Sequence, residues 1–527
     1  MDIEARESWS GKLGFVLAAA GSAIGLGNIW KFPYITGMNG GGAFVLVYLG
    51  CVLLFGLPLM LCEITIGRKT GRNPYGAFKA LQAKHSRTAD VIAILLVVSS
   101  VFLALSGHYG FSVVLFGAAL LFLRLGFAAV GLLSLVTAML ILSYYAVVGA
   151  WIVDYVWRAF SGGLRFAQVS EAAQAFDFYQ EHEPGRIAIE LIIFMALTAG
   201  MIVFGIRKGI ERCSKVLMPL LFFLLIAVII RGVTLPGAKA GIRFFLQPDF
   251  SKLSVNGVLV ALGHAFYSLS LAMGITITYG SYLRKDENIF STSFWVVALD
   301  TLAALLGGLA IFPAVFAMGL DPSAGPGLIF NVLPATFNRI PGGMGWFWAG
   351  LFFVMLTIAA LTSAAALLES GVTFLMDQFK IRRVHAVTGS FVGITVLGFL
   401  TCYSTNDWSR LPGVDRFVRR VFDVKTASWF DLLDTLTSNW MLPLIGLLTV
   451  IFVGWIWGAR KAGQELRQGT RGFTDENLIT LLSGFGGDPA YLGSSNSGLT
   501  ILTLWGLLVR YVAPVIMAVI CLQVIFK

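Results

Sequence analysis

Apolar stretches long enough to cross a membrane recur along the whole of this chain of 527 residues. Hydrophobic residues make up 57% of the sequence and charged residues only 13%, so the chain lacks the charge of a soluble domain. A helix needs roughly 20 residues to cross about 30 Å of hydrocarbon, where lipid offers backbone N–H and C=O groups no partner. The runs are apolar on all sides and lack the alternation of a membrane β-barrel. The sequence therefore predicts an all-α polytopic membrane protein.

Charge, Gly and Pro bound these apolar runs and predict eleven core helices. The helices are expected at 12–37, 42–66, 130–159, 187–206, 209–231, 255–282, 289–318, 346–378, 384–403, 430–457 and 499–526. A further apolar insertion, 89–127, is interrupted at Gly107-His108-Tyr109-Gly110, which predicts two short spans or a re-entrant hairpin. The longest polar stretch, 458–498, predicts a cytoplasmic loop with a short surface helix before the C-terminal helix 499–526.

The net charge of +10 lies in short basic clusters between apolar runs, which argues against a nucleic-acid partner. The clusters are Arg68, Lys69, Arg72, Lys79, Lys84 and Arg87; Arg207, Lys208, Arg212 and Lys215; Lys380, Arg382 and Arg383; and Arg460, Lys461, Arg467 and Arg471. Basic loops favour the cytoplasmic side, so we expect an inner (plasma) membrane protein with a cytoplasmic N-terminus. The loop with Arg410, Arg416, Arg419, Arg420 and Lys425 would then be an external exception.

The cysteines and the first residues exclude two other classes. Five scattered cysteines without CxxC or CxH spacing argue against a zinc site or a disulfide framework. Met1 to Gly11 lack the pattern of a cleaved signal, so the first apolar segment is expected to stay in the protein.

Two spans carry small, flexible residues in the middle, at Gly21-Ser22-Ala23-Ile24-Gly25-Leu26-Gly27-Asn28 and at Ser268-Leu269-Ser270-Leu271-Ala272-Met273-Gly274. Each mid-helix glycine costs about 1 kcal/mol relative to alanine. An unwound segment at bilayer depth is tolerated where it lines a cavity, and its free carbonyls and half-helix ends can bind cations and a carboxylate. Close helix packing through small residues is the alternative. Two matched breaks favour an inverted repeat with a binding site at the membrane midplane.

The residues around the first break resemble the neurotransmitter:sodium symporter family. The resemblance starts with Gly21-Ser22-Ala23-Ile24-Gly25-Leu26-Gly27-Asn28-Ile29-Trp30-Lys31-Phe32-Pro33 and Asn39-Gly40-Gly41-Gly42-Ala43-Phe44. It continues at Gly56 to Leu59, Glu63, Gly67-Arg68, Leu142 to Tyr145, Lys208 to Glu211, Phe266 to Ser270, Leu361 to Ser363 and Arg510 to Pro514, and omits 89–127.

This resemblance implies one membrane transport domain, 1–527, with inverted five-helix repeats at 12–231 and 255–457. It implies import of an amino acid with sodium by alternating access and no enzymatic chemistry. A sensor of the same fold that binds its solute without moving it is the alternative. A membrane-embedded enzyme would need a cluster of reactive side chains, and only Asp300 and His264 fall near the expected site.

Two sodium sites are implied by the same resemblance. One takes the carbonyls of Gly21, Ile24 and Ala359 with the hydroxyls of Thr362 and Ser363; the other takes the Ala23 carbonyl, Asn28, Ser268, Asp300 and the carboxylate of the substrate. Oxygen atoms suit a hard alkali cation. From the residues alone, Thr362 and Ser363 could instead bond their own helix backbone. Asp300 is a functional candidate by itself, because a carboxylate within an apolar span is costly.

The implied substrate site holds a carboxylate at the Leu26 and Gly27 amides and the Tyr145 hydroxyl, and an ammonium group at the carbonyls of Ala23, Tyr267 and Ser268. The pocket for the side chain of the substrate would be formed by Ser22, Ile141, Tyr267, Ser270, Met273, Ser363, Ala366 and Leu367. Gly25 stands where monoamine transporters carry an aspartate. We therefore expect a neutral α-amino acid with a moderately apolar side chain.

The resemblance also implies gates and an ionic requirement. Lys31 with Asp434 would close the outside and Arg6 with Asp377 the inside, although each residue could be an ordinary surface charge. Asp300 stands where the family usually has asparagine, while Ala304 offers neither charge nor hydrogen bond. The carboxylate of Asp300 then supplies the negative charge that chloride provides in other members, so we expect transport without chloride.

Overall fold

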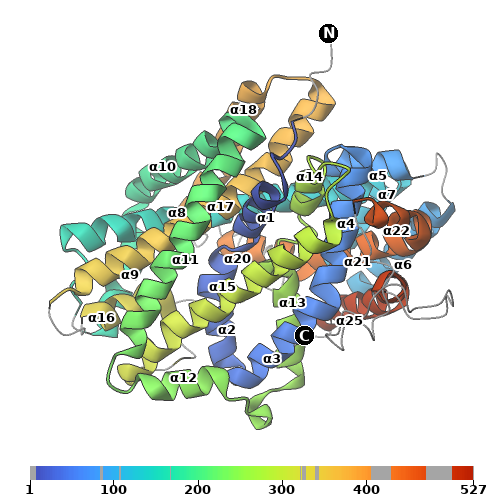
Figure 1. Ribbon diagram of the computed structural model, residues 1–527. Helices are drawn as coiled ribbons and strands as arrows, with labels where there is room; N and C mark the ends of the chain where they lie inside the picture. The colour runs from blue at the N-terminus through green and yellow to red at the C-terminus, as the bar shows by residue number, and fades with distance from the viewer. Residues whose placement is uncertain are drawn as a thin grey trace, which may run out of the picture.

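The computed structural model describes residues 7–82, 87–105, 109–166, 168–320, 322, 328–338, 343–404, 429–469 and 501–525. Within these ranges nine helices are long and apolar enough to cross a membrane, or ten if the bent pair Lys12–Ala23 and Gly27–Met38 forms one span. The prediction of an all-α polytopic membrane protein is confirmed. Figure 1 shows the helices as one bundle.

The helices at the eleven predicted positions contain short breaks or wide π-helical turns, which carry the label η. All of them except α13 with α14 are long and apolar enough to be counted among the ten candidate spans. In chain order they are α1 (Lys12–Ala23), η1 (Gly27–Lys31) and α2 (Phe32–Met38); α3 (Gly42–Cys51), η2 (Val52–Gly56) and α4 (Leu57–Thr70); α8 (Ala128–Ser161); α10 (Pro184–Val203); η3 (Ile206–Glu211) and α11 (Arg212–Val233); α13 (Val255–Ser268) and α14 (Ile275–Gly280); α15 (Ile289–Ala317); α17 (Gly345–Phe379); α18 (Arg383–Ser404); α20 (Trp429–Asp434), η7 (Thr435–Met441), α21 (Leu442–Ile451) and η8 (Phe452–Ile456); and α24 (Ile501–Leu507), η10 (Leu508–Val512) and α25 (Ala513–Ile525).

Shorter helices connect the spans, and the sequence patterns predicted only α22 among them. They are α5 (Pro74–Leu81), α9 (Val169–His182), α12 (Ala238–Leu246), the 3-10 turn η4 (Phe250–Lys252), η5 (Leu328–Val332), α16 (Leu333–Asn338) and α22 (Ala459–Arg467). The eleven predicted core helices are all present, with ends that differ by a few residues. The predicted helix 255–282 is in fact two helices, because residues 269–274 are not helical.

The insertion forms two helices, α6 (Arg87–Leu105) and α7 (Tyr109–Leu125), at the right-hand edge of the bundle in Figure 1. Ser100 Oγ donates to the Ser112 carbonyl at 2.9 Å and Ser112 Oγ donates to the Ser100 carbonyl at 2.8 Å, which joins the two helices. Their 19 and 17 residues measure about 28 and 26 Å at 1.5 Å per residue. This favours two short spans; Gly107 and His108 of the predicted interruption lie outside the described residues.

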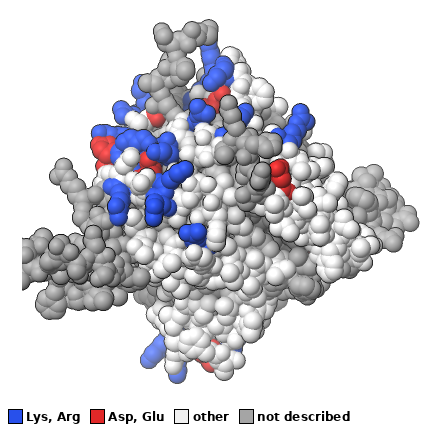
Figure 2. All heavy atoms as spheres, turned by 90° about the vertical axis from the view of Figure 1, so that its right-hand side faces the viewer, with Lys and Arg blue, Asp and Glu red and all other residues white. Residues whose placement is uncertain are grey.

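The basic clusters gather at the end of the bundle that also holds the N-terminal residues. Arg207 Nε donates to the Ser8 carbonyl at 2.6 Å, and Arg383 Nε donates to the Ile202 carbonyl at 2.7 Å. Figure 2 shows most Lys and Arg side chains of the visible face at this upper end, above a broad band without charge. That distribution fits an uncharged middle in lipid and one basic, water-exposed end.

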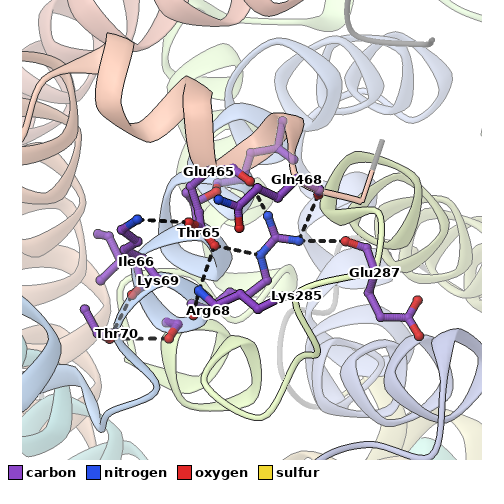
Figure 3. A network of polar contacts seen from close by, with 11 residues as sticks. Thr65, Ile66, Arg68, Lys69, Thr70, Lys285, Glu287, Glu465 and Gln468 are labelled. Atoms are coloured by element: carbon purple, nitrogen blue, oxygen red, sulfur yellow. Dashed lines mark hydrogen bonds and ion pairs between the residues drawn. The ribbon is translucent and has the colours of Figure 1, made fainter. Parts of the chain in front are cut away.

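A buried ion-pair network ties α22 to this same end (Figure 3). Glu465 Oε1 lies 3.1 Å from Arg68 Nε and 3.1 Å from Lys285 Nζ, and the side chains of Arg68 and Glu465 are fully buried. Arg68 Nη1 also donates to the Glu287 carbonyl at 2.6 Å. Burial alone would raise the pKa of Glu465, but the hydrogen bond from Lys285 and the charge of Arg68 outweigh it and lower that pKa. The network thus joins the ends of α4 and α22 to the loop before α15.

Candidate functional site

The first break lies between Ala23 and Gly27, where the span bends by 49°. Ile24 is extended, with ψ 93°, so the residues after it leave the helical hydrogen-bond ladder. The Gly25 amide donates to Asn28 Oδ1 at 3.1 Å and the Leu26 amide donates to the Tyr145 hydroxyl at 3.4 Å. Two amides of this break therefore donate to side chains in the centre of the bundle.

The second break covers residues 269–274, between α13 and α14. Ser270 and Ala272 have φ of 54° and 65°, a left-handed conformation that costs energy in residues other than glycine. The buried carboxylate of Glu63 holds this segment: Oε1 accepts from the Ala272 amide at 2.8 Å, and Oε2 accepts from the Thr276 hydroxyl. The strained loop is thus fixed by a carboxylate on α4.

The two breaks meet at the carbonyl of Ser22 near the end of α1. Ser363 Oγ on α17 donates to this carbonyl at 2.8 Å, and Ser270 Oγ donates to it at 3.1 Å. Ser22 Oγ is buried and has no hydrogen-bond partner among the described residues. The Ser22 carbonyl on the first interrupted span therefore accepts hydrogen bonds from both the second interrupted span and α17.

A small cavity of about 30 Å³ lies beside the Ser22 carbonyl, which is room for one or two water molecules. Every residue that lines it belongs to the predicted substrate set; Ser268 and Ala366 of that set are buried outside its lining. Its apolar part includes Ile141, Met273 and Leu367. The structure thus brings twelve of the fourteen predicted substrate residues around one space.

Gly25 keeps this cavity open. A Cβ atom there would lie 3.1 Å from the Tyr145 hydroxyl and 3.2 Å from Ser363 Cβ, and still closer to Ser363 Oγ. Contacts this short would force both side chains to move. The absence of a side chain therefore leaves room beside the Leu26 amide.

Asp300 on α15 is fully buried within a polar cluster next to the cavity. Its Oδ1 accepts from Asn28 Nδ2 at 2.7 Å and its Oδ2 accepts from Ser268 Oγ at 3.0 Å. The Tyr48 hydroxyl donates to Ser268 Oγ at 3.2 Å. Three of the predicted ligands of one sodium site thus lie together. A half-turn of the Asn28 amide would direct its oxygen, instead of its nitrogen, at the same space.

The predicted ligands of the other sodium site lie where α1 and α17 pack. Thr362 Oγ1 donates within its own helix, at 3.1 Å to the Ile358 carbonyl and 3.1 Å to the Ala359 carbonyl. Ser363 instead bonds across to Ser22. Thr362 therefore bonds its own helix backbone, which was the alternative to sodium binding, whereas Ser363 connects α17 to α1.

The outer predicted gate pair is assembled. Lys31 Nζ lies 3.9 Å from Asp434 Oδ1 and 4.3 Å from the centre of the Tyr267 ring. Beyond it, the buried ring of Phe330 lies 6.1 Å from Trp30 and 5.8 Å from Trp151. This end of the cavity is closed by an ion pair and an aromatic layer.

At the other end, Trp9 closes the bundle. Its ring is 1% exposed, and its Nε1 donates to the Tyr279 carbonyl on α14 at 3.0 Å. Asp377 accepts from the Asn73 amide at 3.0 Å and from Asn73 Nδ2 at 2.8 Å. Arg6, its predicted partner, lies outside the described residues.

Sequence reasoning missed the site roles of Glu63, Tyr48 and Trp9. Glu63 carried the same signal as Asp300, a carboxylate within an apolar span. Tyr48 and Trp9 carried none, because aromatic residues are common in such spans. His264 is 4% exposed, stacks on Phe32 at 5.8 Å, and neither ring nitrogen has a hydrogen-bond partner among the described residues.

The described residues contain no group of three or more His, Cys, Asp or Glu side chains that could hold a metal ion of the transition type. The oxygen atoms at the breaks are instead those of hydroxyls, carbonyls, an amide and the carboxylates of Asp300 and Glu63. Such a set suits an alkali cation and the charged groups of a small solute better than bond-breaking chemistry.

Comparisons with known proteins agree with this geometry. A model described as the sodium:neurotransmitter symporter family matches residues 6–117 and 175–485. The unmatched stretch between them includes only residues 118–127 of the predicted insertion. The chain is 33% identical over 519 residues to the uncharacterized sodium-dependent transporter YhdH of Bacillus subtilis, covering 98% of this chain and 97% of the relative.

Two further matches also span nearly the whole chain. An uncharacterized sodium-dependent transporter of Haemophilus influenzae is 32% identical over 526 residues, covering 99% of this chain and 98% of the relative. The crystal structure of MhsT in complex with L-phenylalanine matches with a TM-score of 0.75 at 35% identity, covering 99% of this chain and 100% of that one.

Proposed function

The chain belongs to the sodium:neurotransmitter symporter family and is a sodium-dependent transporter, and on that premise we propose that it imports a neutral, apolar α-amino acid together with sodium. It acts as a multi-pass membrane protein and not as an enzyme. The observation that carries the proposal is the cavity between the two helix breaks, lined by residues of the first break and Tyr145 at one end and by apolar side chains at the other.

The residues that line the cavity offer partners for both ends of an α-amino acid, and we propose that the cavity widens around the bound solute. A carboxylate would bind the Leu26 and Gly27 amides and the Tyr145 hydroxyl, in the space that Gly25 leaves open. The unpartnered hydroxyl of Ser22 would give a further polar contact. The ammonium group would take carbonyl oxygens at Ala23, Tyr267 and Ser268.

The other end of the cavity favours an apolar side chain. Ile141, Met273 and Leu367 line it, and none of the described lining residues carries a charge. MhsT, at 35% identity, is known in complex with L-phenylalanine. A charged or strongly polar side chain would lose its hydration there without a partner.

We assign two sodium ions to the oxygen sets beside the cavity. One would bind at Asn28, Ser268 and Asp300 with the carboxylate of the substrate, so that ion and solute share a contact and raise each other's affinity. The other would bind between α1 and α17, where Thr362 Oγ1 would turn from its own helix toward the ion.

Alternating access is supported by the closure of both ends of the cavity. Lys31 and Asp434 close one end, and Trp9 closes the other, so opening one side at a time would carry the solute across. The basic end that holds the N-terminus would face the cytoplasm, in the inner (plasma) membrane. Arg6 with Asp377 would form the inner gate.

Transport is proposed to be independent of chloride. Asp300 places a fixed negative charge beside the proposed sodium ion, where an uncompensated buried charge would cost several kcal/mol. Wild type should keep its uptake when gluconate replaces chloride, and Asp300→Asn should lose uptake in gluconate. Loss of wild-type uptake without chloride, or normal uptake by Asp300→Asn in gluconate, would show that the carboxylate does not replace the anion.

A solute sensor of the same fold is the second candidate function, because a cavity that binds a solute does not by itself require that the solute is transported. A thermal-shift screen of the twenty amino acids, in sodium and in potassium, identifies the solute that stabilises the protein. Radiolabelled uptake of that amino acid into proteoliposomes then separates the two functions. A transporter accumulates it under a sodium gradient, whereas a sensor binds it in sodium but does not accumulate it.

A further inference from the structure

Arg510 is the only charged residue between Ile501 and Ile525, the last membrane-spanning segment of the chain. It lies in η10 and is exposed at the outer surface of the bundle. A charged side chain within such a segment is costly in hydrocarbon unless it pairs or reaches the headgroup region. The transport site does not use Arg510, so its position calls for a separate explanation.

Two aromatic rings hold the guanidinium of Arg510 in place. Its central carbon lies 4.5 Å from the centre of the Trp455 ring and 5.5 Å from that of Tyr511. The two rings meet edge to face at 5.8 Å, and Trp455 Nε1 donates to the Arg510 carbonyl at 2.9 Å. That hydrogen bond fixes the orientation of the indole, so the three side chains pack together as one cluster on the protein surface.

Within the part of the chain that the structure describes, no anionic side chain pairs with the guanidinium. Among the described residues, Arg510 has no carboxylate partner, and none of its guanidinium N–H groups donates a hydrogen bond to protein. The aromatic rings stabilise the cation through its face, and no described residue accepts a hydrogen bond from its N–H edge. Five donors in a planar fork match the paired oxygens of a phosphate group.

The neighbouring residues indicate that Arg510, Trp455 and Tyr511 lie at the level of the lipid headgroups, where the phosphate groups of a membrane are found. Trp455 is the second-last residue of its span, and Trp455 and Tyr511 are 52% and 49% exposed. Exposed Trp and Tyr gather at the level of lipid headgroups. The segment before Arg510 packs on the polar helix α22, with Leu502 against Gly463, so it leaves the hydrocarbon here.

We propose that Arg510, Trp455 and Tyr511 form a binding site for the phosphodiester group of a membrane phospholipid. The guanidinium donates two parallel hydrogen bonds to the phosphate oxygens, and the rings support the glycerol and acyl region beside it. A phospholipid with an anionic headgroup binds more tightly than a zwitterionic one, because its net charge adds to the attraction.

The test titrates purified full-length protein in detergent with phosphatidylglycerol or phosphatidylethanolamine and counts bound lipid by native mass spectrometry. Removing a charge-assisted bidentate contact is expected to weaken binding about ten- to a hundredfold in Arg510→Gln. Arg212→Gln, which removes an exposed arginine at the start of α11, is the matched control and should bind lipid as wild type does.

Equal lipid binding by wild type and Arg510→Gln would overturn the proposal, as would an equal loss in Arg212→Gln. Inorganic phosphate is the third arm: stabilisation of wild type by phosphate but by neither lipid would also overturn it, since the ligand would then be a free anion. If Arg510→Gln is not recovered, Arg510→Lys replaces it. Lysine cannot form the fork, so lipid binding should weaken severalfold, and unchanged binding would contradict the site.

Discussion

Gly25 stands at the point where the first helix break, Tyr145 and Ser363 come together. Its missing side chain leaves the space that the proposed carboxylate of the substrate would fill. Tyr145 and Ser363 belong to α8 and α17, whose packing in the bundle core leaves them little freedom to retreat.

Gly25→Leu is therefore expected to abolish amino-acid binding while the protein still inserts into the membrane. The measurement is the thermal shift that the best amino acid produces in sodium, together with the yield of folded protein. Gly50→Leu is the control, because a Cβ at Gly50 meets no atom within 4 Å. Normal binding by Gly25→Leu would exclude this space as the carboxylate site.

Individual residues differed in how well the sequence predicted them. A carboxylate in an apolar span identifies Asp300 directly, and the same argument applied to Glu63 would have found the residue that holds the second break. The contacts of Thr362 and Ser363 could not be predicted, since a hydroxyl in a helix can bond either its own backbone or a neighbour. The neighbour is known only once α1 and α17 are packed.

At the level of elements, the unwound segment 269–274 depends on a carboxylate from another helix. Glu63 satisfies the Ala272 amide and the Thr276 hydroxyl, and its loss leaves two buried donors without an acceptor, at about 1–3 kcal/mol each. The left-handed residues Ser270 and Ala272 then have less to hold them in place.

Glu63→Ala should therefore weaken amino-acid binding at least tenfold and also lower the melting temperature. Each factor of ten in affinity corresponds to about 1.4 kcal/mol of binding free energy. Binding of the radiolabelled amino acid in sodium measures the first effect. Glu181→Ala, which removes an exposed glutamate of α9, should change neither quantity. Unchanged affinity in Glu63→Ala would mean that the segment keeps its shape without the carboxylate.

The buried ion-pair network of α22 gives a prediction about how stability depends on pH. The pKa of Glu465 is lowered in the folded protein, so its carboxylate contributes stability above the ordinary glutamate pKa of about 4.3 and loses it as pH falls through the lowered value. The melting temperature of wild type should exceed that of Glu465→Gln at neutral pH, and the difference should shrink in acid. A difference that stays constant as the pH falls well below the ordinary pKa of about 4.3 would exclude ionised Glu465 as the source.

For the whole molecule, length and hydropathy were enough to predict the spans, because lipid forces each apolar run of about twenty residues into a helix. Short connectors such as α9 and α12 could not be predicted, since tertiary contacts stabilise helices this short. The repeat boundaries at 12–231 and 255–457 remain a prediction. The α6–α7 hairpin lies at the edge of the bundle (Figure 1), and none of its described residues lines the cavity.

A protein without the α6–α7 hairpin is expected to keep its transport activity if the deletion leaves the buried residue Phe127 in place. Gln82 Nε2 donates to the Leu125 carbonyl at 3.2 Å, so the two ends lie close enough for a short polar linker. Phe127, however, is fully buried and its ring lies 5.1 Å from that of Phe452. Deletion of 89–125 should leave sodium-driven uptake measurable, whereas deletion of 89–127 also removes Phe127, at about 3–5 kcal/mol.

Expression and uptake of both deletions provide the measurement. If the deletion of 89–125 is expressed and folded but does not transport, the hairpin takes part in the mechanism. If both deletions are equally stable, the packing of Phe127 on Phe452 contributes little.

Sodium-driven accumulation through the cavity between the breaks is the central claim, and uptake into proteoliposomes tests it most directly. The radiolabelled amino acid that best stabilises the protein should accumulate above its external concentration under an inward sodium gradient. Accumulation should stop when potassium replaces sodium, and in Thr362→Val. Thr357→Val, which removes a hydroxyl bonded to the Phe353 carbonyl on the same helix, should transport normally. Accumulation of equal size in potassium, or in Thr362→Val, would contradict the account.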